Sequence, residues 1–144
     1  MGSRREGREL CLQALYLHDN CGLSPQDSWD TASKNGGANE EKTLSTAIIK
    51  FARALYLGTI EYQESLNDII QKQCLNWQIE RMAVLDRNIL RMATYEIIHT
   101  PDTPIKVIIN EAVEIAKNFS TEESGKFVNG ILDKLKTRRS EKKD

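Results

Sequence analysis

The chain has 144 residues, of which 40% are hydrophobic and 28% are charged, and its formal net charge at pH 7 is −1. This length allows a buried core without disulfides or bound metal, and the near-zero charge excludes a protein whose whole surface is basic. Three cysteines without a C-x-x-C pair argue against a disulfide framework and a zinc site, and no apolar run is long enough to span a membrane.

The first half of the chain is predicted to be helical. A helix is expected from residue 3 to residue 19, ending near Gly22. Residues 23–39, which contain a proline and a glycine pair, are typical of a variable loop or of a short helix followed by a linker. Residues 43–73 predict either one long helix with a kink at Gly58 or two consecutive helices.

The second half predicts further helices with recognisable starts. Residues 77–99 keep the helical spacing of apolar side chains, with Asp86 as an N-cap after a break near Leu85. The next helix is expected to begin with Thr103 as its cap and Pro104 in the first helical position. These patterns predict an all-α protein.

The last predicted helix and the tail that follows it complete the chain. Ser120 and Glu123 have the spacing of a capping box, so a helix is expected to begin at Ser120. Residues 1–137 then form one helical domain, and the basic tail at 138–144 is expected to be disordered.

One face of the first helix carries unusual side chains for a solvated surface. A helical wheel groups the residues expected to face the core: Leu10, Cys11, Ala14, Leu17 and His18. Arg5, Leu12 and Tyr16 point the opposite way. Such a face suits a nucleic acid, because arginines pair with phosphates and a ring stacks on a base. Alternatively, a second layer of helices covers Leu12 and Tyr16.

The arginines at this helix start also need an explanation. Arg4, Arg5 and Arg8 lie at the positive end of the helix dipole, where cations are unfavourable. A bound phosphate would offset this repulsion. The alternative is local pairing with Glu6 and Glu9.

A second candidate surface lies at the start of the last helix. Lys126 is followed by Phe127, which falls at the edge of the apolar stripe and is expected to be half exposed. Ser120, Thr121 and Ser124 offer amides and hydroxyls to a phosphate. The alternative is that Phe127 packs at the rim of the core.

Patterns of catalysis are missing from the sequence. Cys11 and His18 are too far apart on one helix to form a nucleophile and base pair, and both are expected to face inward. Glu111 and Glu114 have no histidine at metal-site spacing. His99 closes a helix, where a positive imidazole is favourable without catalysis. We expect no catalytic residue, no metal and no cofactor.

Three stretches together carry a family signature: RREGRELCLQALY from Arg4, DRNILRMATYEI from Asp86, and PIKVIINEAVEIAKNFSTEESGKFVNGILDKL from Pro104. They resemble the NusB family of bacterial transcription antitermination factors over essentially the whole chain. The runs INEAVEIAK and KFVNGILD are the most specific, whereas residues 23–42 match nothing. The resemblance implies an all-α fold, a compact bundle of about seven helices in two packed subdomains.

The resemblance also implies partners and site residues. It implies a non-catalytic, cytoplasmic regulator of transcription that binds single-stranded boxA RNA of ribosomal RNA leader transcripts. NusE, a small-subunit ribosomal protein, and the transcription elongation complex are the implied protein partners. By position, the RNA-binding residues are Arg4, Arg5, Arg8, Tyr16, Ser124, Lys126 and Phe127. The partner-binding residues are Tyr16, Asp86 and Arg91.

One departure from the family pattern and two alternatives remain. Glu6 and Gly7 interrupt the arginine run, which is expected to weaken RNA affinity or to make RNA binding depend more on the partner. An exposed Gly7 is also expected to make the first helical turn fray. A NusB-like domain also precedes the catalytic domain of some ribosomal RNA cytosine methyltransferases, but the sequence has no Rossmann-type glycine motif. The other alternative is a protein-only helical scaffold, such as a homodimer that covers Tyr16.

Overall fold

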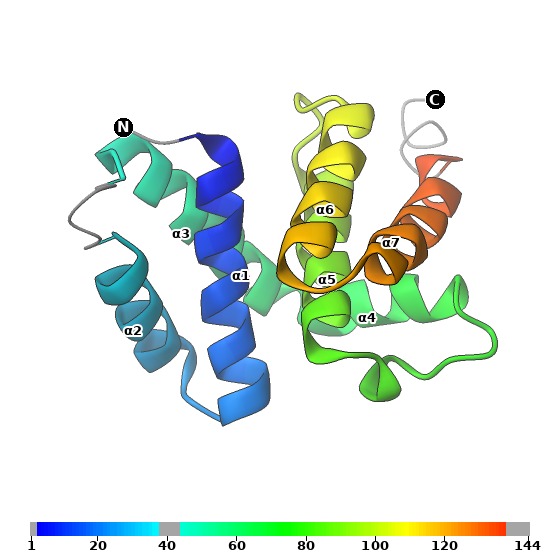
Figure 1. The fold of residues 1–144 in the computed structure, drawn as a ribbon, viewed down its shortest axis with the longest axis horizontal. Coiled ribbons are helices and arrows are strands. Elements are labelled where there is room, and N and C mark those ends of the chain that lie inside the picture. The colour runs from blue at the N-terminus through cyan, green and yellow to red at the C-terminus, as the bar shows by residue number, and fades with distance from the viewer. Residues whose placement is uncertain (1–2, 38–43, 138–144) are drawn as a thin grey trace. The chain divides into compact units, whose positions relative to one another are not determined.

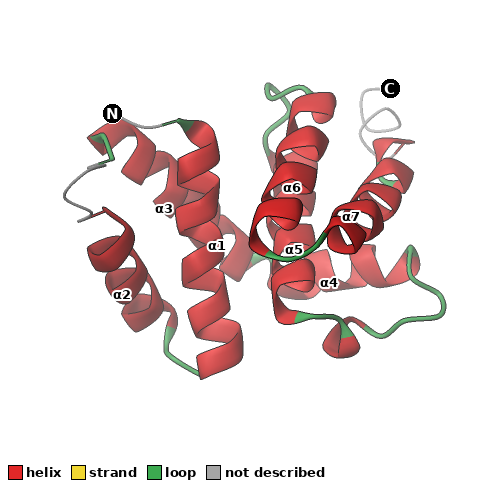
Figure 2. Cartoon of the chain, in the orientation of Figure 1, coloured by secondary structure: helices red, strands yellow, loops and turns green. Residues whose placement is uncertain are grey.

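The computed structural model describes residues 3–37 and 44–137, except for the side chains of residues 35–37. Helices account for nearly all of this part of the chain and no strand occurs in it, so the all-α prediction is confirmed (Figure 2). In chain order the elements are α1 (Arg4–Cys21), α2 (Pro25–Gly37), α3 (Thr46–Glu61), α4 (Gln63–Lys72), the 3₁₀ helix η1 (Ile79–Arg81), α5 (Val84–His99), α6 (Ile105–Phe119) and α7 (Glu122–Lys134). The predicted basic tail lies outside the described residues.

The chain divides into two compact units, residues 1–61 and residues 62–144. In the N-terminal unit, α1 contacts both α2 and α3 (Figure 1). Tyr56 of α3 is fully buried, stacks on Trp29 of α2 with ring centroids 5.7 Å apart, and donates a hydrogen bond from its hydroxyl to the Pro25 carbonyl at 2.8 Å. Residues 23–39 therefore contain a helix with its own core contacts, the second of the two forms expected.

The buried face of α1 is wider than the helical wheel predicts. Leu12 is fully buried, so the prediction that it points outward is wrong. The reason is that α1 packs against two helices and buries an arc instead of a stripe. Leu17 and His18, expected in the core, are half-buried. The helix ends where Gly22 adopts a left-handed conformation with φ of 73°, close to the predicted stop.

In the C-terminal unit, α5 contacts α4, α6 and α7, and α6 packs against α7 (Figure 1). Most of α5 is buried, so this helix is the centre of the unit. The stretch predicted over residues 43–73 is two helices, α3 and α4, and they separate after Glu61 rather than at Gly58, which is buried inside α3. None of the described helices is both long and apolar enough to cross a membrane.

Three predicted helix caps are wrong. Asp86 lies inside the first turn of α5, whose N-cap is Ala83 without a side-chain hydrogen bond. The N-cap of α6 is Pro104 rather than Thr103. At α7 the cap is Thr121, whose Oγ1 accepts a hydrogen bond from the Ser124 amide at 3.0 Å. The cap is therefore one residue later than predicted, because the adjacent threonine carries an equivalent hydroxyl, and the capping box expected from Ser120 and Glu123 is wrong.

Candidate nucleic-acid and partner interface

Phe51 of α3 supports two of the three arginines at the start of α1. The guanidinium carbons of Arg4 and Arg8 lie 4.7 Å and 5.3 Å from the centroid of its ring, within the range of cation–π attraction. Gly7 allows this approach, because a Cβ added there would lie 2.8 Å from Cδ2 of Phe51. Gly7 is buried, so the prediction of an exposed, fraying glycine is wrong.

The helix start is also stabilised locally. The Ser3 amide donates to Oε1 of Glu6 at 2.8 Å, and the Glu6 amide donates to Oγ of Ser3 at 3.3 Å, which is a capping box. The Glu6 carboxylate therefore offsets part of the repulsion between the arginines and the helix dipole through this capping box. Arg4 is exposed and Arg5 half-buried, whereas Arg8 is 3% exposed. The outermost arginines are the ones positioned to meet a phosphate.

Tyr16 lies at the edge of the core of the N-terminal unit. Its side chain is half-buried, and its hydroxyl accepts a hydrogen bond from Nδ2 of Asn20 at 3.1 Å. This geometry fixes the ring while leaving part of it accessible. Tyr16 therefore retains the exposure that stacking on a base requires.

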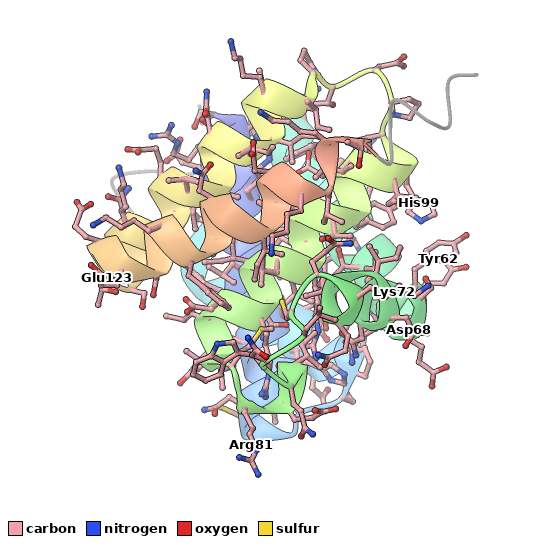
Figure 3. The ribbon with its side chains drawn as sticks, turned by 90° about the vertical axis from the view of Figure 1, so that its right-hand side faces the viewer. Tyr62, Asp68, Lys72, Arg81, His99 and Glu123 are labelled. Atoms are coloured by element: carbon pink, nitrogen blue, oxygen red, sulfur yellow. The ribbon has the colours of Figure 1, made fainter. Side chains whose placement is uncertain are left out.

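The start of α7 presents a basic and aromatic pair in the C-terminal unit. The Lys126 side chain is 74% exposed and forms an ion pair with Glu123 at 3.6 Å, and Phe127 is half-buried as expected. Figure 3 shows Glu123 at the outer end of this helix. Surface ion pairs of this kind are weak, so a phosphate can compete for Lys126.

Lys117 of α6 belongs to the same surface, and the sequence patterns did not reveal it. A Cβ added at Gly125 would lie 2.8 Å from Cγ of Lys117, so the lysine stem passes directly over the glycine. Its ammonium group is 3.6 Å from the Glu114 carboxylate. The only local signal for this contact was the glycine preceding Lys126.

Ser124 is buried and its hydroxyl is engaged within the protein. Its Oγ lies 2.9 Å from Oγ of Ser120 and 3.3 Å from Oγ1 of Thr121. Ser124 is therefore placed to orient the start of α7 rather than to offer a free hydroxyl.

Asp86 is buried at the start of α5. Burial raises the pKa of its carboxyl group above the ordinary 3.8, and the hydrogen bond from Ser124 opposes this shift. Oδ1 of Asp86 has no hydrogen-bond partner among the described residues. A buried carboxylate in this state destabilises the folded protein at neutral pH.

The raised pKa of Asp86 gives a testable pH dependence. The folded state holds the proton more tightly than the unfolded state, so this contribution to stability is full below pH 3.8 and is lost as the pH rises through the raised pKa. Asp86→Asn cannot titrate. We expect the unfolding free energy of wild type, relative to Asp86→Asn, to fall with rising pH in urea titrations between about pH 4 and about pH 7. A difference that is constant or grows with pH would contradict this assignment.

Arg91, the other predicted partner-binding residue, connects two helices. It is 6% exposed, its Nε donates to Oδ1 of Asn67 at 2.8 Å, and its Nη1 donates to Oδ1 of Asn88 at 3.0 Å. The bond to Asn67 joins α5 to α4, and the bond to Asn88 lies within α5. Arg91 is therefore suited to hold the residues of this surface in place rather than to contact a partner over a large area.

The loop between α4 and η1 exposes two large apolar side chains that the sequence patterns did not single out. Leu75 is 90% exposed and Trp77 is 57% exposed. Gln71 holds the loop, since its Nε2 donates to the Cys74 carbonyl at 3.1 Å and its Oε1 accepts from the Ile79 amide at 3.0 Å. Exposed apolar side chains on an ordered loop are typical of a protein-docking surface.

His99 lies in an aromatic cluster away from the start of α7. Its ring stacks on Tyr62 and on Tyr95, with centroids 4.4 Å and 4.7 Å apart. Figure 3 shows His99 and Tyr62 on one side of the view and Glu123 on the other. In the residues that the structure describes, no group of three histidine, cysteine or acidic side chains could hold a metal ion.

Comparisons with known proteins agree with this fold. A model of the NusB family matches residues 5–137. The transcription antitermination protein NusB of Myxococcus xanthus is 41% identical over 135 residues, 94% of this chain and 95% of that protein. NusB of T. maritima gives a TM-score of 0.81 at 36% identity, over 93% of this chain and 90% of that one. A crystal structure of antitermination factors NusB and NusE in complex with double-stranded RNA contains a chain that shares the fold. Its TM-score is 0.83 at 23% identity, over 94% of this chain and 96% of that one.

Proposed function

The chain belongs to the NusB family, and we propose that it is a non-catalytic transcription antitermination factor that binds boxA-type RNA together with NusE. The observation that carries the proposal is the match to a transcription antitermination protein over 94% of the chain. The RNA is the leader of ribosomal RNA operons, and the site of action is the cytoplasm.

We propose that each unit contributes its own RNA contacts. In the N-terminal unit, Arg4 and Arg5 bind phosphate and Tyr16 stacks on a base, because these side chains keep exposed surface. The buried Arg8 supports them through Phe51. In the C-terminal unit, the proposed contacts are Lys117 from α6, and Lys126 and Phe127 from α7. Ser124 acts indirectly, since its hydroxyl is engaged.

NusE is proposed to dock near the start of α5. Asp86 and Arg91 are too buried to supply most of the contact area, so the exposed Leu75 and Trp77 of the preceding loop provide the apolar part. Arg87 ties that segment to α5, because its Nη1 donates to the Glu80 carbonyl at 2.9 Å. Aromatic side chains of this kind often dominate the energy of protein interfaces.

Titration of labelled boxA-type RNA and a scrambled RNA, with and without NusE, tests the proposal. We expect preferential binding of boxA RNA that strengthens when NusE is present. The double variant Arg4→Ala/Arg5→Ala should bind several-fold more weakly at unchanged melting temperature, whereas Arg53→Ala, an exposed arginine on α3, should bind normally. Equal affinity for both RNAs would refute the proposal. A stable homodimer without RNA affinity would favour the protein scaffold.

RNA binding is also expected to depend only moderately on salt. Each phosphate contact to single-stranded RNA contributes about 0.7 to the slope of log affinity against log salt concentration. The four proposed basic contacts, Arg4, Arg5, Lys117 and Lys126, then give a slope of about −3. Affinity measured over a series of salt concentrations checks this value. A slope that requires ten or more released ions would show that the assigned basic residues are not the main contacts.

A further inference from the structure

The loop between α4 and η1 is anchored at both ends and exposed in the middle. Cys74 at its start and Ile79 at its end are buried, whereas Leu75 and Trp77 between them are mostly exposed. A loop that only connects two helices would gain stability by burying side chains as large and apolar as these. Stability alone therefore does not account for the outward direction of Leu75 and Trp77.

One side chain binds three backbone groups of this loop. Nε2 of Gln71, on α4, donates hydrogen bonds to the carbonyls of Cys74 and Trp77. Oε1 of Gln71 accepts a hydrogen bond from the Ile79 amide. A glutamine side chain has two amide protons and one carbonyl oxygen, so these bonds use both protons and the oxygen. Gln71 therefore holds the backbone at Trp77 and on both sides of it.

The other contacts of the loop hold its first residues. The Trp77 amide donates to the Cys74 carbonyl at 3.2 Å, which closes a turn over residues 74–77. Nζ of Lys134, on α7, donates to the Gln73 carbonyl at 3.3 Å. Lys134 reaches the loop before the turn begins, whereas Gln71 binds the turn at both of its ends. The direction of Trp77 therefore depends mainly on Gln71.

We infer that Gln71 is a positioning residue for partner binding: its three hydrogen bonds hold the loop so that Leu75 and Trp77 point outward in the free protein. The inference rests on the proposed docking of NusE on these two side chains. A loop that is ordered before binding loses less conformational entropy when the partner docks, so the same contacts give a higher affinity. Gln71 acts through the loop and supplies no contact of its own.

Titration of NusE against three variants tests the inference. Gln71→Glu keeps the size of the side chain and an acceptor for the Ile79 amide, but it turns an oxygen toward the carbonyls of Cys74 and Trp77. NusE affinity should fall about three- to tenfold. Gln71→Leu removes all three hydrogen bonds and should weaken binding at least as much.

Gln78→Glu is the matched control. Gln78 is exposed on the same loop and gives η1 no side-chain cap, and the substitution adds the same charge. This variant should bind NusE as wild type does. If Gln78→Glu weakens binding as much as Gln71→Glu, the added charge and not the lost hydrogen bonds explains the effect, and the inference is overturned.

Two measurements on the free protein report the order of the loop without NusE. The Ile79 amide should exchange its hydrogen faster in Gln71→Leu, which has no acceptor, than in wild type or Gln71→Glu. Of the two tryptophans, Trp29 is buried, so Trp29→Phe isolates the fluorescence of Trp77. Its anisotropy decay should show faster local motion in both Gln71 variants and wild-type motion in Gln78→Glu.

The outcomes separate the inference from the proposed function. If both Gln71 variants free the loop but bind NusE as wild type does, or if they leave the loop ordered, the inference is overturned and the function stands. If Trp77→Ala also binds NusE normally, the proposed docking surface is wrong. The exchange and anisotropy data then decide whether Gln71 holds the loop. If Gln71→Leu unfolds, Gln71→Glu and its control give the same decision.

Discussion

Replacing Leu12 by alanine is expected to lower the free energy of unfolding by about 2–5 kcal/mol, because its side chain is fully buried and its removal leaves a cavity in α1's packing. Tyr16, one turn later on the same helix, is only half-buried. Tyr16→Ala should therefore act mainly on RNA binding, by the roughly 1–3 kcal/mol that stacking on one base contributes. Urea unfolding and RNA titration of both variants separate the two effects.

Gln13 provides the control, since it is exposed beside Leu12. Gln13→Ala should leave both stability and RNA affinity close to wild type. If Leu12→Ala stays as stable as wild type and loses RNA affinity instead, Leu12 lies on the RNA surface after all. If Tyr16→Ala unfolds the protein while the folded fraction binds normally, the Tyr16 ring belongs to the core.

Leu12 shows how far the sequence predicts the first helix. Its helical spacing and its end near Gly22 could be read directly, because both are local. The wheel failed at Leu12 since it assumes one buried stripe, whereas contacts with α2 and α3 bury Leu12 as well as Leu10 and Leu15. The number of packing neighbours is a property of the fold, so a single helix does not reveal it.

Helix starts in the second half of the chain were predicted less well than the helices themselves. Ser120 and Thr121 are adjacent and carry equivalent hydroxyls, so the choice between them depends on backbone geometry. Asp86 is favourable both as an N-cap and inside a first turn, where the dipole also attracts an anion. The capping preferences of single residues therefore predicted the first residue of each helix to within a few positions, but not more accurately.

The side chains of the candidate site could be predicted from the sequence, but the residues against which they pack could not. The arginine run, Tyr16 and the pair Lys126 and Phe127 stand out in the sequence. The ring of Phe51 beneath Arg4 arises from tertiary contacts between separate helices. No local pattern encodes such contacts, and the exposed loop before α5 was missed for the same reason.

The glycine that admits Phe51 gives the second large expected effect. Gly7→Val should lower the free energy of unfolding by about 1–3 kcal/mol, because a Cβ at this position would lie 2.8 Å from Cδ2 of Phe51 and 3.3 Å from Cγ2 of Ile48. Displacing the ring also removes the surface over which the Arg4 guanidinium lies. RNA affinity measured under conditions where the variant is fully folded should therefore fall as well.

A glycine-to-valine substitution at Gly130 separates the clash with Phe51 from the intrinsic effect of valine on helix stability. Gly130 lies in α7, is exposed, and has no atom within 4 Å of an added Cβ. Gly130→Val should change stability by less than about 0.5 kcal/mol, since valine is slightly better than glycine in a helix interior. If both variants unfold at the same urea concentration as wild type, α1 and α3 do not approach as closely as the structure indicates. If Gly7→Val is destabilised but binds RNA normally when folded, Phe51 stabilises the N-terminal unit without orienting Arg4.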